Sequence, residues 1–271
     1  MKGTLKYIVI FSLILFGCDL ERELDIQNVD IERQYFIECY LQPDSLFNLS
    51  ATEVSPIFED FILDYSLDFD VFIIEQDTVE LLQSLFIEDE TGYIYNFGSG
   101  RRLRPEANQV DLLVVSPQGD SIRGFTKVPS SIDILEANWT DNQISIQFES
   151  SDNPQENYFL YIINYQVENQ GERPQEKNEL TYLDYSFLEE RQTLNAVIDS
   201  DSLSLSSEVD VTLMRVTREN FRYQKSLDAA KNASQDNVTF PSPLEGNIMG
   251  GLGIFTCFTQ DHRLLIRSDN P

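Results

Sequence analysis

The sequence predicts a mainly β fold, with two β-sandwich domains and one or two short helices. Apolar and polar residues alternate with period two along much of the chain, as they do in strands with one buried face. These short segments are rich in Val, Ile, Tyr and Phe, and most end at Gly, Pro, Asn, Asp or Ser. Many short strands separated by turn signals are typical of sandwiches, whereas strands that alternate with long helices indicate a parallel sheet.

Residues 1–17 have the pattern of an export signal. Lys2 and Lys6 form a positively charged region before the apolar run 7–16, which is too short to span a bilayer. The run ends in Leu15-Phe16-Gly17-Cys18, which resembles the bacterial lipobox, where a lipid is attached to the cysteine and the signal is cut just before it. The alternative is an ordinary secretory signal with an incidental cysteine. Under the lipobox interpretation, acyl chains on Cys18 anchor the mature protein to a membrane.

Residues 18–30 are expected to form an acidic tether. Four acidic residues follow Cys18 within seven positions: Asp19, Glu21, Glu23 and Asp25. An acidic run at this place resembles the signal for display on the outer leaflet in Bacteroidota lipoproteins. The alternative is a solvated tether that an anionic membrane surface repels.

The first sandwich domain is predicted over residues 31–128. Its first strand, 35–41, places Ile37 and Cys39 on one face and Glu38 and Tyr40 on the other. Further strands are expected at 65–74, 92–97, 110–116 and 124–128, and residues 77–86 are expected to form a short helix. The domain ends just before Pro129, which small polar residues follow.

The second domain is predicted over residues 129–271. Strands at 132–139, 143–149 and 157–167 resemble the first strands of an immunoglobulin or fibronectin type III sandwich. Later strands are expected at 194–198, 209–216 and 253–258, and a helix at 218–233 with Thr217 as its cap. Trp139, the only tryptophan, is expected to anchor the core, with sugar stacking as the alternative.

The composition excludes several classes of function. The chain carries 19 basic and 46 acidic residues, a formal charge of -27, which offers nothing to nucleic-acid phosphates. Its single histidine, His262, excludes multi-histidine metal sites and leaves a catalytic triad only one base. The sequence therefore predicts no metal, no cofactor and no nucleic-acid partner.

Four landmarks together resemble a known family. They are Cys18 with its acidic run, the strand 35–41, the motif Thr126-Lys127-Val128-Pro129, and the motif Asn247-Ile248-Met249-Gly250-Gly251-Leu252-Gly253-Ile254-Phe255. This arrangement resembles a Bacteroidota lipoprotein family, domain of unknown function 4249, over nearly the whole mature chain. Phe16 and Thr256-Cys257 depart from its usual pattern. Members look like outer-membrane lipoproteins often encoded beside TonB-dependent receptors, so the resemblance implies an accessory role at an outer-membrane transporter. It carries over no catalytic residue.

Gly250, Gly251 and Gly253 have two interpretations. Glycine permits a tight bend or close backbone packing before the last strand, which is the favoured interpretation. A docking loop for a partner is the alternative. A phosphate loop is excluded because Ile254 and Phe255 follow where it needs Lys and Ser or Thr.

Two other groups of residues are candidates for a site or a cross-link. Arg101, Arg102 and Arg104 could hold a carboxylate or phosphate, or they could only neutralise neighbouring acids such as Glu88. Cys39 and Cys257 could form a disulfide or remain buried thiols, and buried thiols are favoured because a chain of this length can bury a sufficient core.

The sequence thus predicts a non-enzymatic outer-membrane lipoprotein at the cell surface. It would act as a binding or accessory subunit of a TonB-dependent β-barrel transporter. The alternative is a structural or adhesive surface lipoprotein without a transporter, and a third hypothesis is a carbohydrate-active hydrolase.

Overall fold

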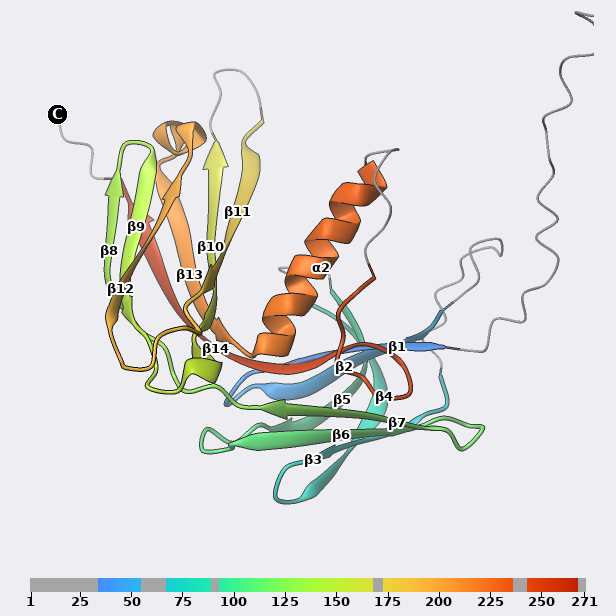
Figure 1. Ribbon diagram of the computed structural model, residues 1–271. Coiled ribbons are helices and arrows are strands. Elements are labelled where there is room, and N and C mark those ends of the chain that lie inside the picture. Colours follow the sequence, from blue (N-terminus) through green and yellow to red (C-terminus); the bar gives the residue numbers. More distant parts are fainter. Residues whose placement is uncertain (1–33, 55–66, 89–92, 168–172, 236–242, 268–271) are drawn as a thin grey trace, which may run out of the picture. The chain divides into compact units, whose positions relative to one another are not determined.

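The computed structural model describes residues 34–54, 67–88, 93–167, 173–235 and 243–267 (Figure 1). The predicted signal peptide 1–17, Cys18 and the acidic tether 18–30 lie outside these residues. The compact unit Gln34–Pro271 contains all the described elements. In the described part of the chain, no helix combines the length and the hydropathy needed to cross a membrane.

Fourteen strands, one α-helix and two short 3-10 helices make up the described residues. In chain order they are β1 Tyr35–Leu41, β2 Leu46–Glu53, β3 Asp70–Ile74, β4 Thr78–Ile87, β5 Ile94–Arg102, β6 Gln109–Val115, β7 Ser121–Lys127, β8 Ile134–Thr140, β9 Gln143–Glu149, η1 Pro154–Glu156, β10 Tyr158–Val167, β11 Gln175–Asp184, β12 Thr193–Asp199, η2 Asp201–Leu205, β13 Glu208–Val216, α2 Arg218–Gln235 and β14 Leu252–Ile266. The predicted mainly β fold with sandwich-like sheets and a helix is confirmed.

The strands form two sheets. Eleven strands are joined in the order β11-β10-β13-β14-β1-β2-β5-β4-β3-β6-β7, and three form a second sheet in the order β12-β9-β8. Neighbouring strands pair antiparallel, except that β1 and β14 run parallel, with Ile37 opposite Gly253 and Cys39 opposite Phe255.

Strand β14 belongs to both halves of the chain. Its residues 252–257 pair with β1, and its residues 258–266 pair with β13. The predicted domain boundary after residue 128 lies in the link between β7 and β8. The last strand therefore returns across this boundary to pair with the first.

Two hydrophobic cores lie on either side of that link. The first is built from the alternating inward residues of β1 to β7, together with Phe255 and Cys257 of β14. In β1 the buried positions are every second residue from Tyr35 to Leu41, as the period-two pattern predicts. The second core lies between the three-stranded sheet and the strands β10 and β13.

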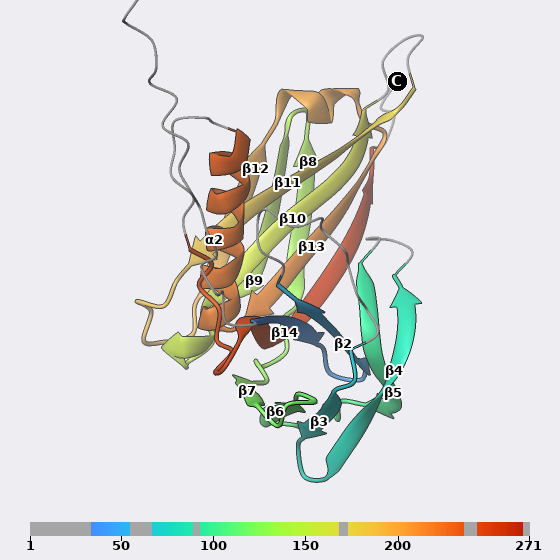
Figure 2. The same ribbon diagram turned by 90° about the vertical axis from the view of Figure 1, so that its right-hand side faces the viewer.

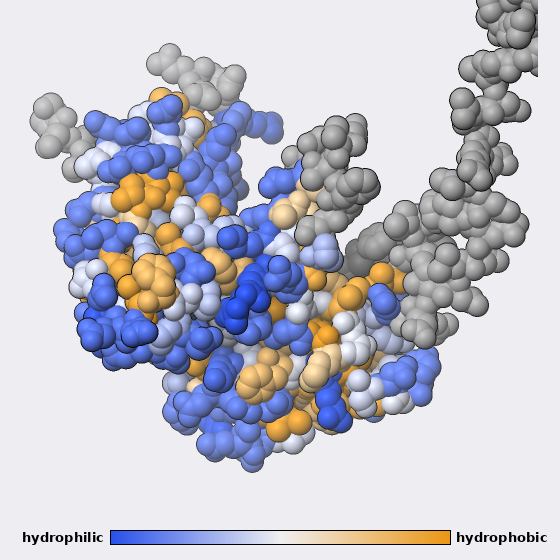
Figure 3. Space-filling model, viewed as in Figure 1, coloured by the Kyte–Doolittle hydropathy of each residue, from blue (hydrophilic) through white to orange (hydrophobic). Residues whose placement is uncertain are grey.

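Helix α2 packs on the other face of β10 and β13. A third apolar cluster joins Phe221 of α2 to Tyr158, Leu160 and Val216 of these strands. Figures 1 and 2 show β10 and β13 between α2 on one side and β8, β9 and β12 on the other. On the face seen in Figure 1, the surface is mainly hydrophilic with separate hydrophobic patches, in keeping with the acidic composition (Figure 3).

The structure confirms the predicted helix 218–233 and its cap. Helix α2 starts at Arg218, and the Thr217 hydroxyl accepts a hydrogen bond of 3.2 Å from the Asn220 amide.

The predicted helix over 77–86 is wrong, because these residues form β4, which pairs with β3 and β5. The strands β2 and β11 were not expected. Strand β14 begins where the sequence predicts, yet it continues beyond residue 258 to Ile266.

Candidate functional site

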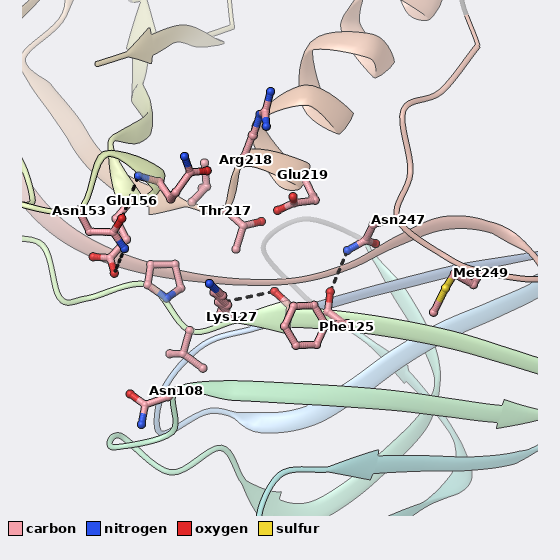
Figure 4. A pocket seen from close by; sticks show the side chains of 15 residues that line it. Asn108, Phe125, Lys127, Asn153, Glu156, Thr217, Arg218, Glu219, Asn247 and Met249 are labelled. Atoms are coloured by element: carbon pink, nitrogen blue, oxygen red, sulfur yellow. Dashed lines mark hydrogen bonds between the residues drawn. The ribbon is translucent and has the colours of Figure 1, made fainter. Parts of the chain in front are cut away.

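A cavity of about 580 Å³ lies where the end of β7, the start of α2 and the segment before β14 meet (Figure 4). Phe125, Lys127, Thr217, Asn247 and Met249 are among its lining residues. This volume is in the range of pockets that bind small molecules.

Strand β7 forms one wall of the cavity and is the last strand of the eleven-stranded sheet. Its neighbour β6 pairs with it from Gln109 opposite Lys127 to Val115 opposite Ser121. On the other edge, Arg123 and Met249 exchange two main-chain hydrogen bonds, of 2.9 and 2.8 Å. The segment before β14 therefore covers part of the β7 edge, and the cavity begins where this cover ends.

Asn247 fixes this arrangement with its side-chain amide. Its Oδ1 accepts from the Phe255 amide at 2.8 Å, and its Nδ2 donates to the carbonyls of Phe255 at 2.8 Å and Phe125 at 3.2 Å. Figure 4 shows the bond between Asn247 and Phe125 at the rim of the cavity. The side-chain amide of Asn247 thus links β14 to β7 by hydrogen bonds to the main chain of both strands.

The start of α2 forms the opposite wall. The Thr217 hydroxyl, besides capping the helix, lies 2.9 Å from the Thr256 hydroxyl of β14. This contact holds the first turn of the helix against the same strand that Asn247 binds. Arg218 and Glu219 follow at the surface, and neither side chain has a hydrogen bond or ion pair with the described residues.

The third wall is the short helix η1. Its cap residue Asn153 accepts from the Gln155 amide at 3.2 Å and donates to Glu156 at 3.3 Å. Partial burial acts to raise the pKa of Glu156, but hydrogen bonds from Ser130 and Asn153 outweigh it, and the pKa is lowered. Glu156 is therefore held as a carboxylate by structural contacts.

Arg215 holds the link between β7 and β8 in place below this wall. Its guanidinium donates to the carbonyl of Ser131 at 2.6 Å, the hydroxyl of Ser130 at 2.7 Å and the carbonyl of Glu149 at 2.8 Å. It also lies 5.3 Å from the centre of the Phe159 ring. Burial lowers the pKa of Arg215, while Glu156 acts in the opposite direction.

The glycines of the motif before β14 serve close backbone packing. Gly250 and Gly253 have φ values of 83° and 106°, which favour glycine. A Cβ on Gly253 would lie 2.0 Å from the Ile37 carbonyl oxygen, and a Cβ on Gly251 would lie 2.9 Å from the Tyr35 carbonyl oxygen. These residues let β14 start directly beside β1, while Met249 of the same motif reaches the cavity.

Arg101, Arg102 and Arg104, the candidates for holding an anion, are not among the residues that line the cavity. Arg104 pairs with Glu75, with its Nε 3.0 Å from both carboxylate oxygens. Arg102 donates to the Asp44 carbonyl. The Arg101 guanidinium donates no hydrogen bond to any of the described residues. The acid that pairs with Arg104 is thus Glu75.

Cys39 and Cys257 are free thiols, buried on the neighbouring strands β1 and β14. Burial raises the pKa of Cys257 to about 12 and raises that of Cys39 further, with Cys257 adding to the latter effect. Trp139 packs at the edge of the second core, where the Arg267 guanidinium lies 5.1 Å from its ring.

A second polar cluster was not predicted and lies under α2. The carboxylate of Glu38 accepts hydrogen bonds from the hydroxyls of Tyr223, Tyr93 and Tyr40, at 2.7, 2.5 and 3.1 Å. Burial, followed by the charge of Glu38, raises the pKa of all three tyrosines. The cluster joins α2 to β1 and the strand β5 region, and it is separate from the cavity.

Two apolar residues of the cavity, Phe125 and Met249, could have been found from the sequence as large side chains on exposed positions. Gly124 and Thr126 point inward, so Phe125 between them is a large apolar residue on the outer face of β7, and it is 42% exposed. Met249 is 61% exposed. Their proximity depends on the fold, because they are far apart in the sequence.

Among the described residues, no group of three or more His, Cys, Asp or Glu is placed to hold a metal ion.

The family described as Domain of unknown function (DUF4249) matches residues 21–263. The chain belongs to this family. Comparison with curated proteins finds no match. Two of the four landmarks that carry the resemblance, the motifs at residues 126–129 and 247–255, contribute residues to the cavity described above.

Proposed function

We propose that this member of the DUF4249 family is a non-enzymatic, lipid-anchored binding protein of the outer membrane. In this proposal Cys18 carries the lipid, and the folded part acts as an accessory subunit of a TonB-dependent transporter. The lipobox residues and the acidic run behind Cys18 support the anchor, and the resemblance to the family supports the transporter.

One observation carries the binding role: the two characteristic motifs of the chain meet at one cavity. Lys127 comes from the first motif, and Asn247 and Met249 come from the second. The Asn247 amide bonds to Phe125 and Phe255 show that the second motif is built into this wall. A surface assembled from two such segments is suited to recognition of a partner.

Two polar side chains of the cavity wall, those of Glu156 and Thr217, are held by structural contacts, which favours binding over catalysis. Glu156 is committed to structural hydrogen bonds with Ser130 and Asn153. Thr217, the hydroxyl residue of the opposite wall, caps a helix. A nucleophile needs a neighbouring base, and here the hydroxyl contacts Thr256 instead.

The anchor is tested by replacing its cysteine. The variant Cys18→Ala, expressed in the native host with labelled palmitate, is expected to lose both the label and membrane association. Arg101→Ala, a surface change outside the cavity, serves as the control and keeps both. A Cys18→Ala protein that remains acylated and membrane-bound would refute the lipobox interpretation.

The transporter role is tested by affinity purification of the full chain from solubilised membranes. We expect an outer-membrane β-barrel to be recovered with the tagged protein. Recovery of the protein without a barrel would favour a structural or adhesive role. Turnover of a glycan by the purified protein would overturn the non-enzymatic assignment.

A further inference from the structure

The direction of the main-chain groups along β7 can be read from its hydrogen bonds. Ser116 donates to the Asp120 carbonyl at one end of the β6-β7 pair, and Val128 donates to the Asn108 carbonyl at the other. In an antiparallel pair every second residue is hydrogen-bonded to the neighbouring strand. Counting from these two bonds, the amides and carbonyls of residues 122, 124, 126 and 128 point toward β6. Those of residues 121, 123, 125 and 127 point outward, to the free edge.

The outward main-chain groups of Arg123 are hydrogen-bonded. Beyond it the outward amides are open, while each outward carbonyl accepts one side-chain hydrogen bond, that of Lys127 from the Thr126 hydroxyl at 3.2 Å. Met249 takes both main-chain groups of Arg123. The Phe125 carbonyl accepts only the Asn247 side chain, at 3.2 Å. The amides of Phe125 and Lys127 have no hydrogen-bond partner among the described residues, and both residues line the cavity. An edge strand with open amides beside a cavity is a place where another strand can be added.

We propose that an extended peptide segment of a partner protein adds to β7 at Phe125 and Lys127 and occupies the cavity. Its main chain pairs with the outward groups of these two residues. The proposal rests on the proposed function only in taking the segment to come from a partner at the membrane. It gives that function a site and a class of ligand.

The side chains on this face of β7 define which segment fits. The added residue opposite Lys127 is acidic, since unlike charges on facing strand positions attract. The added residue opposite Phe125 is aromatic or β-branched, and it packs on Phe125 with Met249 beside it. The bridge between Met249 and Arg123 is antiparallel, and we take the added segment to run in the same direction. In the peptide sequence, the acidic residue opposite Lys127 then lies two positions before the apolar residue opposite Phe125.

The experiment uses the full mature chain in detergent and a displayed library of random heptapeptides. We expect wild-type protein to enrich sequences with an acidic residue two positions before an aromatic or β-branched one. Lys127→Pro removes one outward amide and no bond to β6, so it should weaken binding of an enriched peptide about tenfold. Ser121→Pro makes the same change on the same edge outside the cavity and should bind like wild type.

A charge reversal keeps the test informative if the proline variant folds poorly. Lys127→Glu should select peptides with Lys or Arg in place of the acidic residue. The same peptide pool on wild type and Lys127→Pro, or the absence of any charge exchange with Lys127→Glu, overturns the proposal. A dimer of wild-type protein that Lys127→Pro dissociates also counts against it, since a second copy would then occupy the edge. A barrel that purifies with a chain that fails these peptide tests leaves the proposed function standing without this site.

Discussion

The hydroxyl of Tyr223 on α2 donates a 2.7 Å hydrogen bond to the carboxylate of Glu38 on β1. The two residues are 185 positions apart, and Tyr223 is fully buried. Tyr40 and Tyr93 donate to the same carboxylate, so the acid that faces the helix has three phenol partners. Glu38 is only partly buried, and the three phenols replace the water that its carboxylate loses. This cluster fixes α2, whose first turn lines the cavity.

Tyr223→Phe should destabilise the protein by about 1.5 to 3 kcal/mol, because it removes a hydrogen bond to a charged group in a buried place. Urea denaturation followed by circular dichroism measures the change. Tyr185→Phe removes a hydroxyl that has no hydrogen-bond partner in the described residues and should change the free energy of unfolding by less than about 0.5 kcal/mol. Equal effects of the two substitutions would contradict the role of Glu38. A double-mutant cycle with Glu38→Gln isolates the pairwise energy.

Gly253→Ala should cost more than about 2 kcal/mol of stability. The residue has a φ of 106°, and an added Cβ would lie 2.0 Å from the Ile37 carbonyl oxygen, so β14 would have to move away from β1. Gly100→Ala is the matched control, because a Cβ there has no heavy atom within 4 Å. Thermal unfolding compares both variants with wild type. A Gly253→Ala protein as stable as Gly100→Ala would show that the close approach of the two strands is not required.

Strands with one buried face could be predicted from the sequence. Strand β1 has one buried face and one partly covered face, so the period-two pattern of its residues predicts where the strand begins and ends. Strand β4 misled the prediction because its second half exposes apolar residues such as Leu82 and Leu85 at a helical spacing. Its pairing with β3 and β5 decides its conformation, and that pairing is a tertiary effect.

The sites were less predictable than the strands. Glu38 is one of 46 acidic residues, and its partners Tyr93 and Tyr223 are distant in sequence. The cavity likewise unites Phe125 with Met249 only because β14 returns to β1. Both motifs that line it were visible in the sequence, yet their contact depends on the long last strand.

Arg215→Met should destabilise the protein by about 2 to 4 kcal/mol, since the carbonyls of Ser131 and Glu149 would lose a charged donor in a buried place. Arg191→Met is the control: its guanidinium is largely exposed and 3.9 Å from Glu149, so its loss should change stability by less than about 0.5 kcal/mol. Denaturant titration gives both values. If Arg215→Met is tolerated as well as Arg191→Met, the clamp on the link between β7 and β8 is unimportant.

Stability should fall as pH rises above about 9 to 10. Burial raises the pKa of Cys257 from 9.0 to about 12 and that of Tyr95 from 10.0 to about 12, and it raises the pKa of Tyr223 in the same direction. The unfolded chain therefore loses these protons at a lower pH than the folded chain does. The stability linked to each group is fully present below its unfolded pKa and is lost as pH rises through its folded pKa.

Urea denaturation at intervals from pH 8 to 11, with tyrosinate absorbance as a second readout, tests this dependence. Each buried group contributes a slope of at most about 1.4 kcal/mol per pH unit. Tyr223→Phe removes one such group and should show a shallower decline above pH 10 than wild type. Identical slopes for the two proteins would mean that Tyr223 ionises as readily in the folded chain as in the unfolded one, which its buried contact with Glu38 opposes.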